Sequence, residues 1–171
     1  MPLGTPFSRT EDYCGEWYTP KLPAEDYHQF HMKEKGYAAI AMLLHIAIGL
    51  MPAMGLNVFY AAIFYMAGLV LIIYLTILLY RGPAQKQPLS EPQHRKFARR
   101  PRILVNVQRM LAMLTLMMVV IANFQYQLGI RLWFLLQVAL LLLEALSLQF
   151  LYRLQRDLKW EISGTKPEEY E

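Results

Sequence analysis

Two ionisable residues, Glu144 and His45, stand in otherwise apolar stretches and are the first candidates for chemistry. Glu144 lies within a run of leucines about nine residues before Arg153, and His45 lies ten residues after Lys35. At 1.5 Å per helical residue, each would lie roughly 13–15 Å from the nearest charged flank. Such residues usually face other helices and are paired or functional. A His–Glu contact at this depth either relays protons or only fixes how the helices pack.

Three more polar residues extend this intramembrane polar site. Gln137 and Ser147 are seven and three residues from Glu144, which places all three on one face of a helix. Arg109 is expected in the antiparallel partner helix, about one turn closer to the cytoplasm. Its guanidinium group would either reach Glu144 or extend past Asn106 to the lipid headgroups.

A stripe of small residues is expected to turn His45 toward the other helices. Ala41, Gly49 and Ala53 recur in register with His45, at every fourth position. Small residues at this spacing let a neighbouring helix approach closely in a membrane. The stripe therefore predicts that the imidazole points into a bundle and away from lipid.

Two long apolar regions must position these residues. Residues 36–80 contain no Asp, Glu, Lys or Arg, and residues 110–152 form a similar region interrupted near residues 123–131. One spanning helix needs roughly 20 apolar residues, so each region holds two spans. Pro, Gly and Asn within residues 52–57 favour a turn between the first two. The sequence predicts an all-α membrane protein with four transmembrane helices in two hairpins.

The expected organisation follows the charge pattern. It comprises a tail with the start of helix 1 (1–35), a first hairpin (36–80), a basic linker (81–103), a second hairpin (104–152) and a C-terminal tail (153–171). Of the 17 Lys and Arg residues, seven lie in the linker and four in each tail. Because cytoplasmic loops carry the excess of Lys and Arg, both tails and the linker are expected in the cytoplasm, with the chain in a plasma or inner membrane. A short helix is expected from residue 90 or 91 to 100, and the last helix is expected to continue past residue 159.

The polar segments suggest two kinds of contact. Arg95, Lys96, Arg99 and Arg100 recur at helical spacing and either bind anionic headgroups or only fix the topology. The N-terminal tail is expected to be irregular, and its aromatic residues are candidates for docking a partner, because Trp and Tyr often anchor interfaces. The docking candidates are Tyr13, Trp17 and Tyr18, with Tyr27 and Phe30 nearby.

Other classes of function find no support in the residues. The sequence has no nucleophile elbow, P-loop or zinc-protease motif. His28 and His31 are only two possible metal ligands, so we expect neither a metal site nor a cofactor, and nothing indicates nucleic-acid binding. The leading hypothesis is an accessory or interaction subunit of a membrane complex, with a protein partner or a second copy. The alternative is a small homo-oligomeric transporter or channel using Glu144 and His45, and a membrane enzyme ranks third.

Overall fold

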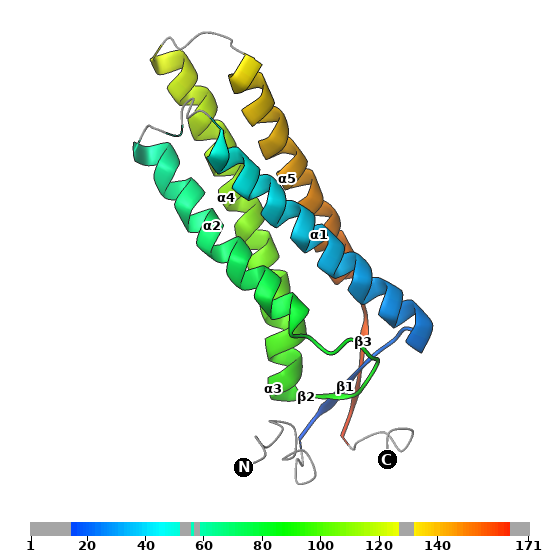
Figure 1. Cartoon of the computed structure of the whole chain (residues 1–171). Coiled ribbons are helices and arrows are strands. Elements are labelled where there is room, and N and C mark those ends of the chain that lie inside the picture. The colour runs from blue at the N-terminus through cyan, green and yellow to red at the C-terminus, as the bar shows by residue number, and fades with distance from the viewer. Residues whose placement is uncertain (1–14, 52–55, 57–58, 127–131, 165–171) are drawn as a thin grey trace, which may run out of the picture.

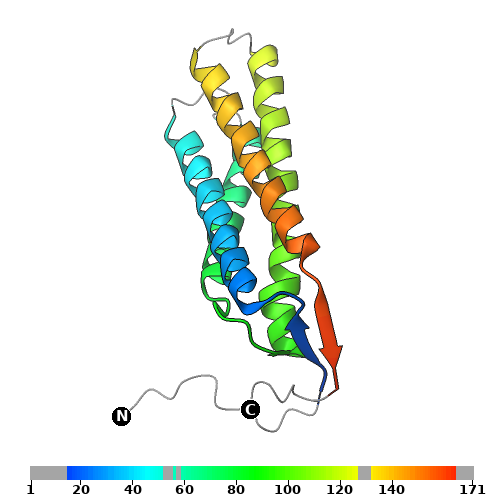
Figure 2. The ribbon, with the colours of Figure 1, turned by 90° about the vertical axis from the view of Figure 1, so that its right-hand side faces the viewer.

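Four long helices form an up-and-down bundle in the computed structural model, which describes residues 15–51, 56, 59–126 and 132–164. They are α1 (Ala24–Leu50), α2 (Phe59–Tyr80), α4 (Arg100–Gln125) and α5 (Leu132–Asp157). Helix α1 packs against α2 and α5, and α4 packs against the same two helices, so the four surround one interior (Figures 1 and 2). The expected all-α bundle of two hairpins is confirmed in its helical part.

The interior follows a seven-residue repeat. Buried positions alternate at spacings of four and three, as in α1, where they are Tyr27, His31, Glu34, Ala38, Ala41, His45 and Ile48. Helices α4 and α5 repeat the same pattern. Because a repeat of 3.5 residues produces left-handed packing of side chains into layers, each interior residue meets residues of the neighbouring helices at its own level. One apolar cluster includes Ala38 and Ala41, and a second includes Ile48, so the level of His45 separates them.

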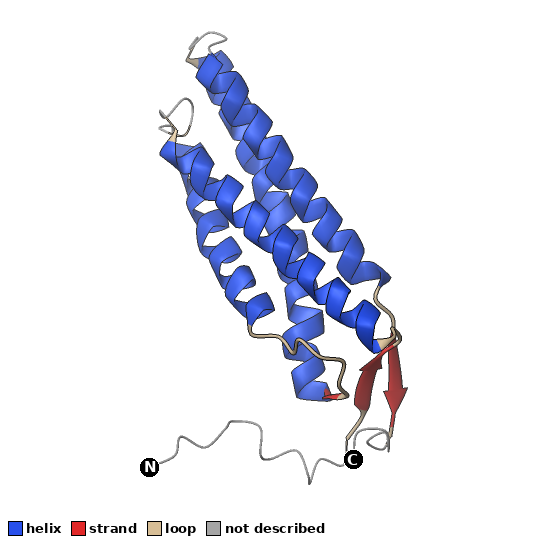
Figure 3. Cartoon of the chain, turned by 45° about the vertical axis from the view of Figure 1, so that its right-hand side comes forward, coloured by secondary structure: helices blue, strands red, loops and turns tan. Residues whose placement is uncertain are grey.

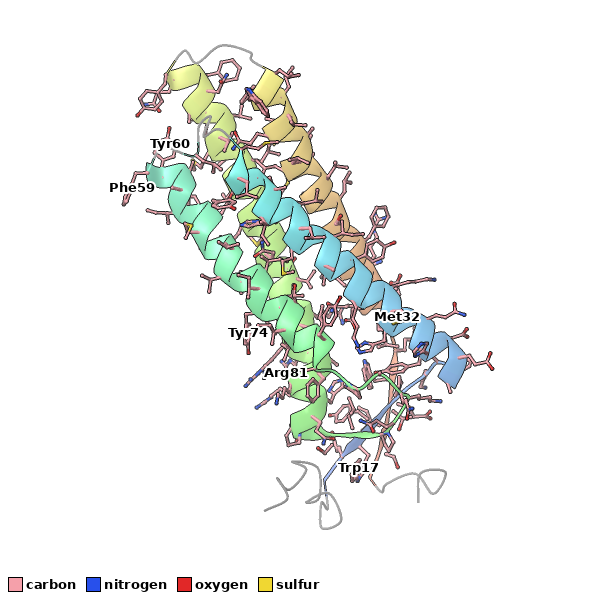
Figure 4. The ribbon with its side chains drawn as sticks, viewed as in Figure 1. Trp17, Met32, Phe59, Tyr60, Tyr74 and Arg81 are labelled. Carbon is pink, nitrogen blue, oxygen red and sulfur yellow. The ribbon has the colours of Figure 1, made fainter. Side chains whose placement is uncertain are left out.

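The outer surface of the bundle is apolar. Leu43, Val70, Phe124 and Leu132 are each more than 60% exposed, and the labelled Tyr74 points away from the bundle in Figure 4. Three helical segments are long and apolar enough to cross a membrane: residues 59–80, 91–125 and 132–157. A bilayer accommodates this surface, since large exposed apolar areas are otherwise rare.

Helix α1 is not among those three segments, although a spanning helix was expected there. The helix ends at Leu50, so even its last 18 residues still contain Lys33, Glu34 and Lys35. Only 15 residues, 36–50, are free of charge, which corresponds to about 22 Å of helix. This length falls short of the roughly 30 Å of a hydrocarbon core.

The linker helix and the third long helix are continuous. Helix α3 (Glu91–His94), the π-helical segment η1 (Arg95–Arg99) and α4 follow one another without a break, whereas a separate short helix was expected up to residue 100. Pro101 lacks an N–H group and would disturb the preceding α-helical turn. The turn directly before it is π-helical, so each N–H group there donates to the carbonyl five residues earlier, as Arg100 N–H does to Arg95 O.

A small sheet covers one end of the bundle, which corrects the expectation of purely helical structure. Its strands are β1 (Trp17–Pro20), β2 (Leu89–Ser90) and β3 (Trp160–Ser163), in the order β2-β1-β3 and all antiparallel. The residues expected as an irregular tail form its central strand, and the last helix ends at Asp157 instead of continuing. Figure 3 shows the strands below the helices, so the two tails and the linker lie at the same end.

Candidate functional site

A central cluster of His45, Glu144, Gln108 and Tyr65 lies in the interior, one residue from each helix. His45 Nδ1 is 2.9 Å from Glu144 Oε1, and its Nε2 is 3.1 Å from the backbone oxygen of Tyr65. Gln108 Nε2 donates to the same glutamate oxygen at 3.3 Å. The side chains of His45 and Glu144 are 1% and 0% exposed, so the structure brings together the two residues that the sequence singled out.

The hydrogen-bond partners determine where protons must lie in this cluster. A backbone oxygen can only accept, so His45 Nε2 carries a hydrogen. One further proton is then shared between Nδ1 and Glu144 Oε1, either as a carboxylic acid with a neutral imidazole or as a carboxylate with an imidazolium. Both forms have zero net charge. A buried neutral pair avoids the large penalty of an isolated charge in an apolar interior.

Glycines and an aromatic ring hold the imidazole in place. The ring of Tyr65 stacks on His45 with centroids 4.5 Å apart, and its hydroxyl group donates to His45 O at 2.9 Å. A Cβ atom at Gly68 would lie 2.9 Å from His45 Cε1, and one at Gly49 would overlap the Tyr65 hydroxyl group. The close approach of α1 and α2 therefore depends on these two glycines. Of the predicted small-residue stripe, Ala41 is buried and Gly49 is exposed on its outer side, and Ala53 lies outside the described residues. The fully buried positions of α1 follow the seven-residue repeat.

The other predicted polar residues are placed differently. Gln137 is fully buried one heptad before Glu144, and neither of its amide atoms has a partner among the described residues. Ser147 is only half-buried, because the next interior position after Glu144 is Leu148. Glu144 Oε2 also lacks a partner within the described part of the chain.

Arg109 does not pair with Glu144. Its guanidinium group donates to Gln149 Oε1 at 2.5 Å and to Asn106 Oδ1 at 2.8 Å, and it lies 4.8 Å from the ring centroid of Tyr152. All three partners are uncharged, so none of them compensates the guanidinium charge. The predicted contact with Glu144 is not made, and the guanidinium group binds Asn106 itself.

A groove extends from Arg109 along the outer side of α4 and α5. Its volume is about 810 Å³, and apolar side chains line nearly all of it. Three of these, Met110, Met113 and Met117, are about half exposed. Methionine side chains are flexible and adapt to partners of varied shape. The lining residues are Arg109, Met110, Met113, Leu114, Leu116, Met117, Leu142, Ala145, Leu146 and Gln149.

A second buried cluster, missed by the sequence interpretation, lies at the end of the bundle that carries the sheet. Glu34 Oε2 is 3.1 Å from His31 Nδ1, and its Oε1 accepts from Gln155 Nε2 at 2.6 Å. We call His31, Glu34 and Gln155 the cavity cluster, because they line a cavity of about 310 Å³. The signal that could have revealed it is spacing: His31 precedes His45 by 14 residues, which is two heptads.

Two of the aromatic docking candidates of the tail lie in the sheet, whereas the basic residues of the linker lie on the surface. Trp17 is buried and Tyr18 stacks on His94 with ring centroids 4.1 Å apart, so both contact the protein's own chain. Tyr13 lies outside the described residues. The basic residues Arg95, Lys96, Arg99 and Arg100 are all exposed, as contact with headgroups requires.

Tyr27 lies beside the cavity cluster, near the start of α1. Burial, and to a lesser degree the charge of Glu34, raises the pKa of Tyr27 to about 12. Its hydroxyl group therefore remains protonated at neutral pH, and it donates to Pro83 O at 3.5 Å. This contact ties α1 to the linker beside the cavity.

Neither a metal site nor a known relative accounts for these clusters. Within the described residues, no group of three or more His, Cys, Asp or Glu side chains is placed to hold a metal ion. No family model matches the chain, and neither a curated protein nor a solved structure matches it. Function must therefore be inferred from the geometry alone.

Proposed function

We propose that this chain is a four-span membrane protein with both tails and the linker in the cytoplasm. Three apolar helices support membrane insertion. Helix α1 packs against two of them, α2 and α5, which supports a position for α1 in the membrane as well. The concentration of Lys and Arg in the tails and linker supports a cytoplasmic location for that end of the bundle. Polar partners for Glu34 in the interior reduce the penalty of carrying a charge on α1.

Cysteine labelling tests this topology. In a Cys14→Ser background, which contains no other cysteine, Ala84→Cys is expected to react with an impermeant maleimide only from the cytoplasmic side. Gln125→Cys, at the other end of α4, is expected to react only from outside. Labelling of both positions from one side would contradict the proposal.

Within this topology, we propose that the chain acts as an interaction subunit that binds a transmembrane helix of a partner in the groove between α4 and α5. The groove carries this proposal: it is apolar and rich in adaptable methionines. Membrane helices associate through close packing and polar contacts, because lipid gives no hydrophobic drive between them. A hollow on the lipid-facing side provides that packing surface.

The partner's chemistry follows from Arg109, which adjoins one end of the groove. Its neighbours are uncharged, so its positive charge is uncompensated within the described residues. A helix with an acidic residue near its cytoplasmic end would pair with it, and charge-assisted hydrogen bonds are the stronger kind. The rest of that helix should be apolar to match the methionines and leucines.

Site-specific photo-crosslinking tests the groove. A photoreactive phenylalanine at Met113 should yield one discrete crosslinked product in native membranes. The same residue at Met66, an equally exposed methionine on α2, should yield only diffuse lipid adducts. Arg109→Gln should weaken the Met113 product, and a second copy of the chain would be recognised by the doubled mass. Equal patterns at both positions would exclude the groove.

A second candidate function is proton-coupled transport, favoured by the 2.9 Å contact of His45 with Glu144. The shared proton can move between the two groups without changing the net charge of the pair. In proteoliposomes, a transporter of this kind would show a pH-driven flux that Glu144→Gln abolishes while the variant remains folded. Wild-type vesicles with no flux above empty vesicles would exclude this candidate.

A further inference from the structure

The cavity at the sheet end of the bundle has two unlike ends. Its floor is the cavity cluster of His31, Glu34 and Gln155, and two arginines also line it, Arg99 at the end of η1 and Arg102 in α4. Aromatic side chains form much of the wall; they are Tyr27, Phe30, Phe97 and Trp160. Its volume of about 310 Å³ is at the lower end of the range for small-molecule sites, roughly 300–1,000 Å³.

The floor presents hydrogen-bond acceptors that have no partner. Both oxygens of Glu34 are occupied, by His31 Nδ1 and by Gln155 Nε2. Within the described residues, no partner contacts His31 Nε2 or Gln155 Oε1, and both side chains are more than nine-tenths buried. When Nδ1–H donates to the Glu34 carboxylate, Nε2 of the neutral imidazole is an acceptor. The floor then carries one negative charge and two free acceptors, which suit a cation with N–H donors.

The rim has the opposite character. Arg99 and Arg102 are exposed guanidinium groups three residues apart on one helix, so both can approach one anion. Guanidinium groups match phosphate oxygens in both geometry and charge. Aromatic walls between the two ends favour a cation as well, because ring faces attract positive charge. A zwitterion with an amine at one end and a phosphate at the other therefore matches the cavity.

The depth of the cavity indicates where such a molecule would come from. On α4 the exposed residues change from Arg102 to Ile103, and at the end of α2 they change from Tyr80 to Arg81. These changes mark the level at which an apolar exterior gives way to a charged one. Gly82 and Arg102 line the cavity just on the charged side of that boundary. In the proposed topology this is the headgroup layer of the cytoplasmic leaflet.

We propose that this cavity binds the headgroup of an ethanolamine phospholipid, with the ammonium group on His31 Nε2 and Gln155 Oε1 and the phosphate on Arg99 and Arg102. The inference rests on the proposed membrane placement. The shared chemistry is that of a primary-amine phosphate, which a soluble phosphoethanolamine also has. The acyl chains would extend from the rim into the bilayer.

Lipid retention measured by native mass spectrometry tests the site. The purified full chain in detergent is mixed with ethanolamine, choline or glycerol phospholipid of identical acyl chains. Choline keeps the charges but lacks N–H donors, and glycerol lacks the positive charge. We expect about tenfold stronger retention of the ethanolamine lipid over both, the scale of one hydrogen bond to a charged group. Equal retention of all three, or preference for the glycerol lipid, would overturn the proposal.

Matched variants locate the binding. His31→Leu and Gln155→Leu should each remove the preference for the ethanolamine lipid. His28→Leu, an exposed histidine on the same helix, should keep it. The pair Arg99→Gln and Arg102→Gln should lower retention, while Arg95→Gln with Arg100→Gln should not, since neither of these lines the cavity. Preference that survives in His31→Leu, or that is lost equally in His28→Leu, would contradict the assignment.

Further measurements distinguish a wrong lipid assignment from misfolding, from a soluble ligand and from a wrong topology. Tm in detergent shows whether a variant is folded, and Gln155→Leu carries the test if His31→Leu is not folded. Competition with soluble phosphoethanolamine distinguishes the sources: if it displaces the lipid at equal concentration, the natural ligand is soluble and the lipid assignment is wrong. If the labelling at Ala84 and Gln125 agrees with the proposed topology but no preference appears, the lipid site fails and the topology stands.

Discussion

The bundle contains two clusters that each include one histidine, one glutamate and one glutamine, and they differ in what the second imidazole nitrogen faces. In the central cluster, His45 Nε2 donates to Tyr65 O, so both nitrogens have partners within the bundle. In the cavity cluster, no described residue satisfies His31 Nε2. The two histidines lie two heptads apart on α1, yet both nitrogens of His45 have partners whereas one nitrogen of His31 faces the cavity. The difference comes from the neighbouring elements: α2 supplies the partner of His45, whereas the linker and the sheet enclose a cavity beside His31.

The largest expected difference between the clusters appears when the histidine is removed. His45→Leu leaves Glu144 buried without its main partner, and breaking a buried pair in this way costs about 3–5 kcal/mol. His31→Leu leaves Glu34 with Gln155 and a cavity that water can enter, so the expected loss is about 1–2 kcal/mol. Equilibrium unfolding in mixed detergent micelles measures both. Equal losses would show that the two clusters are energetically alike.

A smaller effect is expected at the glycine that admits the central imidazole. Gly68→Ala would place Cβ 2.9 Å from His45 Cε1, and such overpacking costs about 1–3 kcal/mol. Gly36→Ala is the matched control, since a Cβ there meets nothing within 4 Å. It should be neutral or stabilise α1 by up to about 1 kcal/mol. A neutral Gly68→Ala would mean that the central layer is loosely packed.

The smallest effect is expected when the central acid becomes an amide. His45 and Gln108 both contact Oε1 of Glu144. In Glu144→Gln an amide nitrogen at this place can donate one N–H to His45 Nδ1 and the other to Gln108 Oε1 once the Gln108 amide turns over, so the loss should stay below about 1 kcal/mol. In Glu34→Gln the amide N–H would face His31 Nδ1 and move the histidine proton to Nε2. Nitrogen-15 NMR of the histidine rings distinguishes the two tautomers. An unchanged His31 tautomer in Glu34→Gln would contradict this hydrogen-bond assignment.

A double-mutant cycle tests whether Arg109 and Glu144 interact. Since Arg109 contacts Gln149 and Asn106 and not Glu144, the effects of Arg109→Gln and Glu144→Gln on the free energy of unfolding should add within about 0.5 kcal/mol. A coupling energy well above this value would support the ion pair that the structure does not show.

The sequence predicted those features that follow from local composition. Long uncharged runs identified the helices, and isolated ionisable residues identified His45 and Glu144. A strict heptad count would also have found Gln108 and His31. It would have placed Leu148 in the interior instead of Ser147, because Leu148 lies only about 40° from Glu144 around the helix and Ser147 about 60°. The sheet could not be predicted, because strands of two and four residues carry little signal and pair with segments far away in the chain. The cavity depends on that sheet and was missed with it.

The sheet also affects the membrane insertion of α1, whose uncharged stretch is shorter than a full span. Strand β1 pairs with β2 and β3, which follow it by about 70 and about 140 residues. During synthesis in a membrane, β1 must wait until β3 has emerged, and contacts of such long range form late. In the proposed topology, a chain whose α1 failed to cross the bilayer would have β1 on the side opposite to its two partner strands. Pairing of the strands is therefore possible only in chains whose first helix has crossed, and the free energy of the sheet favours the inserted form of α1.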